Sequence, residues 1–329
     1  MNSGVSVIIC CYNSASRIKD TLYYLSKQVY EPNLFWEIIV VDNASLDNSG
    51  EVAATFWKST RTNVSLKVVN EAIPGLSAAR KRGVMEANYN VVIFCDDDNH
   101  LEPNYVTTGN HLIRSREEIG IVGAWVKPKL PFNPGLWILD FYPALAIGKR
   151  AETPGWVDWI FGAGMVIKRE IFLELARRGI DTMLSDRVGT KQTSGGDAEI
   201  CVLARFIGYK IFFSPELQLY HAISAHRLSR MSFIKANHLN VYPLIYLYIL
   251  ERLVKDQSQT SSRLYSGYVI ECLGKITHFF PRVLFGKHNF YSFIMLYQNI
   301  QLVFWMLFRR KKFRHTVKEV YQNLYHARA

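Results

Sequence analysis

The chain has no disulfide framework. Its five cysteines are odd in number, none falls in a CxxC motif, and Cys10 and Cys11 are adjacent in an apolar segment. This pattern argues against a disulfide-stapled secreted domain and favours reduced, buried thiols in a cytoplasmic protein. The first four residues lead directly into that apolar segment, so we expect no signal peptide before it.

An uninterrupted membrane-spanning run is also missing. Residues 289–308 are about as long as a bilayer span, but Asn289, Gln298, Asn299 and Gln301 interrupt the apolar residues. We therefore expect an interfacial or core helix there rather than a span. Internal repeats and low-complexity tracts are absent as well, so repeat architectures are not indicated.

Composition and charge narrow the class of partner. The 329 residues are 49% hydrophobic and 20% charged, enough for a substantial core in one large α/β domain with a helical addition, or in two domains. A formal net charge of +11 favours anionic partners such as nucleotide phosphates, nucleic acid or anionic lipid. The basic residues 309–314 directly follow the aromatic, apolar stretch 290–308. That order predicts contact with an anionic membrane surface rather than with nucleic acid.

The first hundred residues alternate between strand and helix patterns. Apolar, β-branched runs predict strands, and apolar residues at helical spacing predict helices between them. Such alternation favours a mainly parallel sheet with helices on both faces, in which ligands bind at the carboxyl ends of the strands. The predicted strands are residues 5–10, 37–41, 66–69 and 91–95, and the predicted helices begin near residues 18, 49 and 75.

The chain changes character near Ala225. Before this residue the alternation continues, and after it the sequence becomes helical, tyrosine-rich and basic. We therefore expect an α/β domain over residues 1–225 and a helical, basic, aromatic-rich C-terminal region over residues 226–329, which suits association with a membrane surface. The segments that continue the alternation are residues 121–126, 169–178, 197–207 and 211–213.

The fourth predicted strand ends in three consecutive aspartates, Asp96, Asp97 and Asp98. Their carboxylates repel one another, so the cluster is costly unless positive charge lies between them. Alternate residues of an extended segment point the same way, so Asp96 and Asp98 can face one ligand. Carboxylate oxygens suit Mg²⁺ or Mn²⁺, although an isolated triplet is equally typical of a solvated acidic loop. Tyr12 and Asp42 also follow strands, which predicts that three polar features converge on one edge of the sheet.

Five blocks of the sequence, in order, resemble those of family 2 glycosyltransferases, the inverting enzymes that use nucleotide sugars. The resemblance covers residues 5 to about 221, two-thirds of the chain. It implies a GT-A fold, with a Rossmann-like, mainly parallel sheet flanked by helices and a helical C-terminal extension. The blocks are VSVIICCYNSASRIKDTLYYLSKQ, EIIVVDNASLDNSGEV, LSAARKRGVMEA, FCDDDNHLEP and SGGDAEICVLARFIGYKI.

The resemblance also implies roles on the donor side. Tyr12, Asp42, Arg80 and Asp96 would bind the nucleotide sugar, for which a UDP-sugar is the expected donor. Tyr12 would contact the base, and Asp42 matches the acid of a turn that typically hydrogen-bonds the base. The structural alternatives are a strand-end aromatic for Tyr12, a helix N-cap or turn former for Asp42, and a solvated basic face for Arg80.

A divalent cation, Mn²⁺ or Mg²⁺, is the cofactor that the resemblance implies. Asp98 matches the second acid of the family's DxD element and would bind the ion. His221 is a second candidate ligand, although a lone histidine is more often structural. The ion would neutralise charge that develops on the diphosphate leaving group. Asp97, the middle residue of the triplet, has no implied role.

On the acceptor side, the resemblance places the catalytic base at Asp197. Inversion at the anomeric carbon needs a base opposite the leaving group, which takes the proton of the acceptor hydroxyl. Gly196 stands where the family often has Glu, and Glu199 stands where it often has Asp. Glu199, Trp156 and Asp158 are the acceptor-side candidates. A helix N-cap is the alternative role for Asp197, and core packing is the alternative for Trp156.

The sequence thus predicts an inverting glycosyltransferase that moves a sugar to an acceptor hydroxyl, expected on a glycan or lipid-linked precursor of a surface polysaccharide. The expected location is cytoplasmic, peripheral on the inner face of the cell membrane. A sugar-phosphate nucleotidyltransferase would need a Gly-rich phosphate loop where residues 11–14 read Cys-Tyr-Asn-Ser. A phosphatase with an aspartate nucleophile would need DxDx[TV], but Asn99 and His100 follow Asp98. A non-catalytic, membrane-associated protein of the same fold stays open.

Overall fold

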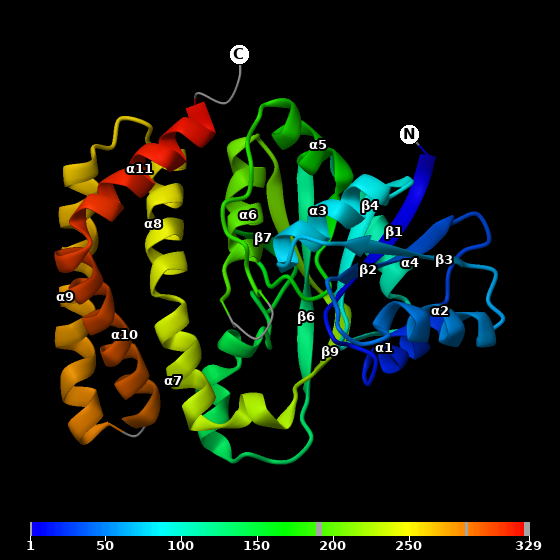
Figure 1. Ribbon diagram of the computed structural model, residues 1–329, viewed down its shortest axis with the longest axis horizontal. Coiled ribbons are helices and arrows are strands. Elements are labelled where there is room, and N and C mark those ends of the chain that lie inside the picture. Colours follow the sequence, from blue (N-terminus) through cyan, green and yellow to red (C-terminus); the bar gives the residue numbers. More distant parts are fainter. Residues whose placement is uncertain (1, 189–192, 287–288, 326–329) are drawn as a thin grey trace.

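The computed structural model describes residues 2–188, 193–286 and 289–325 of the chain. A nine-stranded sheet forms its centre, and a bundle of C-terminal helices lies beside it (Figure 1). The strand order is β3-β2-β1-β4-β8-β6-β9-β5, and β7 pairs with β9. The strands are β1 (Asn2–Cys11), β2 (Trp36–Asn43), β3 (Ser65–Glu71), β4 (Tyr89–Asp96), β5 (Asn99–Leu101), β6 (Ile119–Lys129), β7 (Gly155–Val157), β8 (Val166–Lys168) and β9 (Lys210–Ala222).

Helices follow most of the strands, as the alternating apolar patterns predict. The first three begin at Ile18, Ser49 and Leu76, within one residue of the predicted starts. The helices of the α/β part are α1 (Ile18–Ser26), α2 (Ser49–Ser59), α3 (Leu76–Glu86), α4 (Tyr105–Arg114), α5 (Arg169–Arg177) and α6 (Gly196–Phe206), with short 3-10 helices η1 (Leu136–Phe141), η2 (Pro143–Leu145) and η3 (Ala225–Leu228).

The sheet is parallel where the alternation is regular. β1 pairs in parallel with β2 and β4, β2 with β3, and β6 with β9. β8 runs antiparallel between β4 and β6, so the sheet as a whole is mixed. The predicted α/β fold is confirmed, with less uniform parallel pairing than expected. Cys11 lies opposite Asp42, and Cys10 lies opposite Asp96, so β1, β2 and β4 end at one edge.

Side chains of the central strands alternate between two buried layers. Ile8 and Val92 pack with α3, α5 and α6 on one face, whereas Ile9 and Ile93 pack with α1, α2 and α4 on the other. α3 lies so close to β1 that a Cβ added at Gly83 would overlap Ile8. This close packing fixes the start of α3 relative to the carboxyl ends of the strands.

The described part of the chain after Ala225 is helical. α8 packs on α6, and Ile245 and Ile249 belong to the same buried cluster as Ile200 and Leu203. The C-terminal helices therefore share a hydrophobic core with the α/β part. They are α7 (Arg230–Leu239), α8 (Val241–Lys255), α9 (Ser261–Phe285), α10 (Asn289–Phe308) and α11 (Arg310–Tyr325).

Among the described helices, α10 is the one long and apolar enough to cross a membrane. It packs against α9, and 28% of its most apolar window is buried. Core helices of soluble proteins pass the same test of length and composition, so these properties alone do not make α10 a span.

Candidate active site

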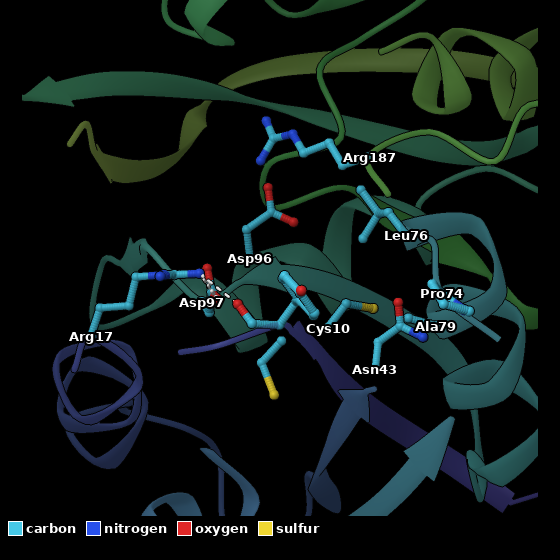
Figure 2. A pocket seen from close by; sticks show the side chains of 11 residues that line it. Cys10, Arg17, Asn43, Pro74, Leu76, Ala79, Asp96, Asp97 and Arg187 are labelled. Carbon is cyan, nitrogen blue, oxygen red and sulfur yellow. Dashed lines mark hydrogen bonds and ion pairs between the residues drawn. The ribbon is translucent and has the colours of Figure 1, made fainter. Parts of the chain in front are cut away.

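A cavity of about 140 Å³, here called the strand-end cavity, opens where β1, β2 and β4 end (Figure 2). Tyr12 directly follows β1, Asn43 ends β2 and Asp96 ends β4, so the register of the sheet brings these residues to one place. The polar part of the lining comes from Tyr12, Arg17, Asn43, Asp96, Asp97 and Arg187. Tyr12 and Asp96 therefore meet at one edge of the sheet, as the strand patterns predict.

Asp97 is buried and links two segments. Its carboxylate accepts a hydrogen bond from the Ser14 hydroxyl. It also accepts one, at 2.7 Å, from the guanidinium of Arg17 (Figure 2). Burial and the charge of Asp98 raise the pKa of Asp97, although Arg17 opposes this shift. Asp97 thus ties the loop after β1 to the end of β4, a structural role for the middle residue of the triplet.

Asp98 and His221 come together across the antiparallel pair β5 and β9. Asn99 lies opposite His221 in this pairing, and His221 Nε2 is 3.3 Å from Asp98 Oδ1. Burial by itself would raise the pKa of Asp98, but the charge and hydrogen bond of His221, with Arg187 and Arg227 farther away, hold it well below its usual range. The carboxylate of Asp98 is therefore ionised at any physiological pH.

The two residues fit a divalent cation as a partial ligand set. Neither ring nitrogen of the buried His221 has a hydrogen-bond partner of good geometry among the described residues, and Nε2 faces Asp98, so the ring keeps capacity for a ligand that it would share with Asp98. Within the same residues no group of three or more His, Cys, Asp or Glu side chains could hold a metal by itself. Mg²⁺ and Mn²⁺ sites built on one or two protein ligands take the others from water and phosphate oxygens.

A second cavity, of about 410 Å³, surrounds Asp197 and is called the Asp197 cavity. Asp197 lies in the first turn of α6, where helix dipoles favour carboxylates. Its Oδ2 accepts the N–H of Gly162 at 3.0 Å, and its Oδ1 accepts the N–H of Ala198 at 2.9 Å. These bonds hold a half-buried carboxylate at the cavity wall.

Asp186 fills the space beside Asp197 that a side chain at position 196 would need. A Cβ added at Gly196 would lie 2.8 Å from Asp186 Oδ2. Arg80 Nη1 lies 3.8 Å from the same oxygen, and both side chains are buried. Burial raises the pKa of Asp186 to about 6, with Arg80 opposing the shift and Asp197 adding to it. The absence of a side chain at Gly196 is thus matched by a carboxylate from the preceding loop.

Two predicted donor-side residues lie elsewhere than expected. Arg80 lines the Asp197 cavity, together with Asp186, rather than the strand-end cavity. Asp42 accepts the N–H of Ser45 at 3.3 Å in the turn after β2, and among the described residues its neighbour Asn43 lines the cavity instead. The sequence signal for Asp42 therefore located the correct turn, one residue away from the cavity wall.

The three acceptor-side candidates do not line the Asp197 cavity. Glu199 is fully buried and accepts hydrogen bonds from the Tyr246 hydroxyl and from the N–H groups of Met183 and Leu184. Trp156 lies on β7 with its ring against Phe212, Arg116 and Lys210. Asp158 is exposed and lies 3.8 Å from Arg205. The aromatic residues that do line the cavity are Trp159 and Phe161.

Sequence patterns do not predict three of the charged residues at the site. Asp186 and Arg187 lie in the segment between α5 and α6, which has no apolar periodicity, and Arg227 lies in η3. Their charges act on the triplet only because these segments fold back onto the end of β4. The local sequence carries no signal of that approach.

The mixed α/β sheet and its acidic strand ends, facing two adjoining cavities, define a protein of the GT-A glycosyltransferase class. The sequence model of the family described as Glycosyl transferase family 2 matches residues 6–175, more than half of the chain. The chain belongs to this family.

Curated relatives agree with this membership. Putative glycosyltransferase EpsH of Bacillus subtilis (strain 168) is 32% identical over 102 residues, which cover 31% of this chain and 28% of that protein. Poly-beta-1,6-N-acetyl-D-glucosamine synthase of Staphylococcus aureus (strain COL) is 24% identical over 199 residues, which cover 56% of this chain and 44% of that protein. The alignments thus span less than half the length of either relative.

Solved structures share the fold. The mannosyltransferase PcManGT from Pyrobaculum calidifontis, in complex with GDP-Man and Mn²⁺, matches with a TM-score of 0.58 and 19% identity, covering 100% of this chain and 89% of that one. TarS 1-349 of S. aureus, in complex with UDP-GlcNAc, matches with a TM-score of 0.53 and 13% identity, covering 89% and 90%. At these identities the likeness supports the GT-A fold alone.

The buried Glu199 predicts a pH dependence of stability. Burial raises its pKa from 4.5 to about 7, although three hydrogen bonds oppose the shift. The folded state thus retains a proton that the unfolded chain releases, and this stabilisation is full below pH 4.5 and lost as the pH rises through about 7. In urea unfolding, the wild type should lose about 2 kcal/mol more stability than Glu199→Gln between pH 5 and pH 8. Parallel pH profiles for the two proteins would contradict this.

Proposed function

We propose that the enzyme transfers a sugar from a nucleoside diphosphate sugar to an acceptor hydroxyl, with inversion at the anomeric carbon. One observation carries the proposal: the strand-end cavity and the Asp197 cavity adjoin at Asp96 and Arg187. A donor lying across this junction would have its nucleoside beside Tyr12 and its sugar beside Asp197. The complexes of similar folds with GDP-Man and UDP-GlcNAc support a nucleotide sugar as donor.

In the proposed reaction, the acceptor oxygen bonds to the anomeric carbon on the face opposite the diphosphate. The bond from that carbon to the diphosphate oxygen breaks, and its electron pair leaves with the nucleoside diphosphate. Asp197 takes the proton of the acceptor hydroxyl. Its carboxylate suits this role because the amides of Gly162 and Ala198 hold it at the wall of the Asp197 cavity.

Donor binding in this proposal is shared between a metal and the strand ends. Asp98 and His221 would hold a Mn²⁺ or Mg²⁺ ion, which when bound neutralises charge on the departing diphosphate. Tyr12 would contact the base and Asp96 the ribose or the metal shell, with a UDP-sugar as the proposed donor. The complex of PcManGT with Mn²⁺ supports a divalent ion in this fold.

Replacing the proposed base should separate binding from chemistry. We expect Asp197→Asn to lower the rate at which nucleoside diphosphate is released from the nucleotide sugar that the wild type uses, by about 10²- to 10⁴-fold. The reason is that the nitrogen and oxygen of an amide are poor proton acceptors. The variant's affinity for the nucleoside diphosphate should stay within about twofold, since Asp197 lies outside the strand-end cavity. The measurement is nucleoside diphosphate release from a panel of UDP- and GDP-sugars with Mn²⁺. Asp20→Asn, an exposed change on α1, is the control.

An unchanged rate for Asp197→Asn would show that Asp197 is not the catalytic base. The wild type could also release nucleotide from none of the nucleotide sugars in the panel and bind no nucleoside diphosphate. That result would contradict the proposal that the donor is a nucleoside diphosphate sugar.

We further propose that the enzyme works at the cytoplasmic face of a membrane on a lipid-linked glycan acceptor. Phe304 and Phe308, at the end of α10, are 58% and 77% exposed. The exposed basic residues 309–312 follow α10 directly. Exposed aromatic rings beside clustered lysine and arginine are typical of proteins that bind anionic lipid surfaces.

Vesicle binding tests this association. We expect the wild type to cosediment with phosphatidylglycerol-containing vesicles, more weakly with pure phosphatidylcholine, and more weakly again in 0.5 M salt, because charge screening removes the electrostatic part. The double change Phe304→Glu and Phe308→Glu should abolish binding, whereas Phe35→Glu, at an exposed phenylalanine between α1 and β2, should not. Equal binding of all three proteins, or none by the wild type, would refute the proposal.

A further inference from the structure

Arg187 lies at the junction of the two cavities. Among the described residues, only Leu76, Asp96 and Arg187 line both, and Arg187 is the basic one. In the proposed function, on which this inference rests, the nucleoside occupies one cavity and the sugar the other. The diphosphate that joins them must then cross the junction. Figure 2 shows the guanidinium of Arg187 beside the carboxylate of Asp96, directed into the open space.

The backbone that carries Arg187 is braced against the start of α3. The N–H of Leu76 donates to the Arg187 carbonyl at 3.1 Å, and the Ser77 hydroxyl donates to the Leu184 carbonyl at 2.5 Å. Gly75, at φ 137°, allows the close approach, because an added Cβ would lie 3.0 Å from the Ser185 carbonyl oxygen. The position of Arg187 is therefore fixed before any ligand binds.

The guanidinium of Arg187 does not help to hold the described fold together. It makes no hydrogen bond or ion pair with another described side chain, and its side chain is exposed to the cavity. Arg17 in the same cavity differs, because its guanidinium is engaged by Asp97 and by the carbonyls of Tyr12 and Asn13. The N–H groups of the Arg187 guanidinium are therefore available to a ligand, whereas few of those of Arg17 are.

Arg227 adds a second unpaired cation. It lies in η3, half-buried, and forms no side-chain hydrogen bond with the described residues. Burial and the neighbouring charge of Arg187 lower its pKa to about 10. Burial would lower the pKa of Arg187 too, but the carboxylates of Asp96 and Asp98 raise it. Two guanidinium groups held near each other favour an anion with several charges.

We propose that Arg187, assisted by Arg227, binds the diphosphate of the donor and stabilises it as the leaving group. As the bond from the anomeric carbon to the diphosphate oxygen breaks, the electron pair moves onto an oxygen within reach of Arg187, and the charge of Arg227 acts from outside the two cavities. A fixed guanidinium at this point acts by electrostatic preorganisation. The site thereby holds positive charge from the chain itself, in addition to any metal bound at Asp98 and His221.

Calorimetric titration of nucleotides in EDTA isolates this role, since no metal can then bridge the phosphates. The probes are UDP and UMP, and in parallel GDP and GMP. The variants are Arg187→Met, which removes the charge at similar length, Arg187→Lys, which keeps it, and Arg227→Met. Arg177→Met, at an exposed arginine on α5, is the charge-matched control. Thermal unfolding of each variant checks the fold.

We expect the wild type to bind the diphosphate more tightly than the monophosphate of one base. Arg187→Met should weaken diphosphate binding on the order of tenfold to a hundredfold, the usual effect of losing a charged hydrogen bond. Monophosphate binding should change by less than about threefold, because a monophosphate lacks the second phosphate that would lie at the junction beside Arg187. Arg187→Lys should restore part of the loss, and Arg227→Met should act in the same direction with a smaller effect.

Two outcomes would overturn the inference. One is Arg187→Met binding the diphosphate as tightly as the wild type and the Arg177→Met control. The other is equal losses for diphosphate and monophosphate, which would give Arg187 a structural role only. If the wild type bound no nucleoside diphosphate with or without Mn²⁺, the proposed function itself would fail, and the inference with it.

Discussion

Charge compensation at the end of β4 is the constraint on which the site depends. Three carboxylates follow one buried strand, and in a partly desolvated position each needs a nearby cation. The chain supplies arginines from the loop after β1 and from the segment before α6, and a histidine from β9, so these contacts help to hold the segments at one edge of the sheet. Asp97 forms an ion pair with Arg17, Asp98 lies 3.3 Å from His221, and the charge of Arg187 acts on Asp96 without an ion pair.

The compensation differs between the structural and the ligand-facing parts of the cluster. The carboxylate of Asp97 is buried, and a hydrogen bond from Ser14 adds to its ion pair with Arg17. Asp96 still faces open space, and Arg187 beside it keeps unused donors. A nucleoside diphosphate with a divalent ion would complete this arrangement, which links the electrostatics of the strand end to donor binding and leaving-group stabilisation.

Local patterns in the sequence predict the strands that position the site, but not all the residues that line it. The strands before Tyr12 and Asp96 are apolar runs, so the ends of β1 and β4 follow from composition and parallel pairing. Arg187 and Asp186 have no such signal, because their positions depend on hydrogen bonds between an irregular loop and α3. Glu199 shows the converse: helical spacing identifies its face of α6 but not the neighbour, Tyr246 of α8, that covers it.

The central claim is that the acidic end of β4 binds a donor diphosphate and a divalent ion together. Titration of Mn²⁺ by electron paramagnetic resonance, with saturating UDP or GDP and with the matching monophosphate, tests it most directly. Asp98 and His221 are too few to hold Mn²⁺ tightly alone, so the diphosphate should raise its affinity by about 5- to 150-fold, the range of a typical coupling between two ligands. An affinity for Mn²⁺ that is the same with diphosphate and with monophosphate would contradict the account.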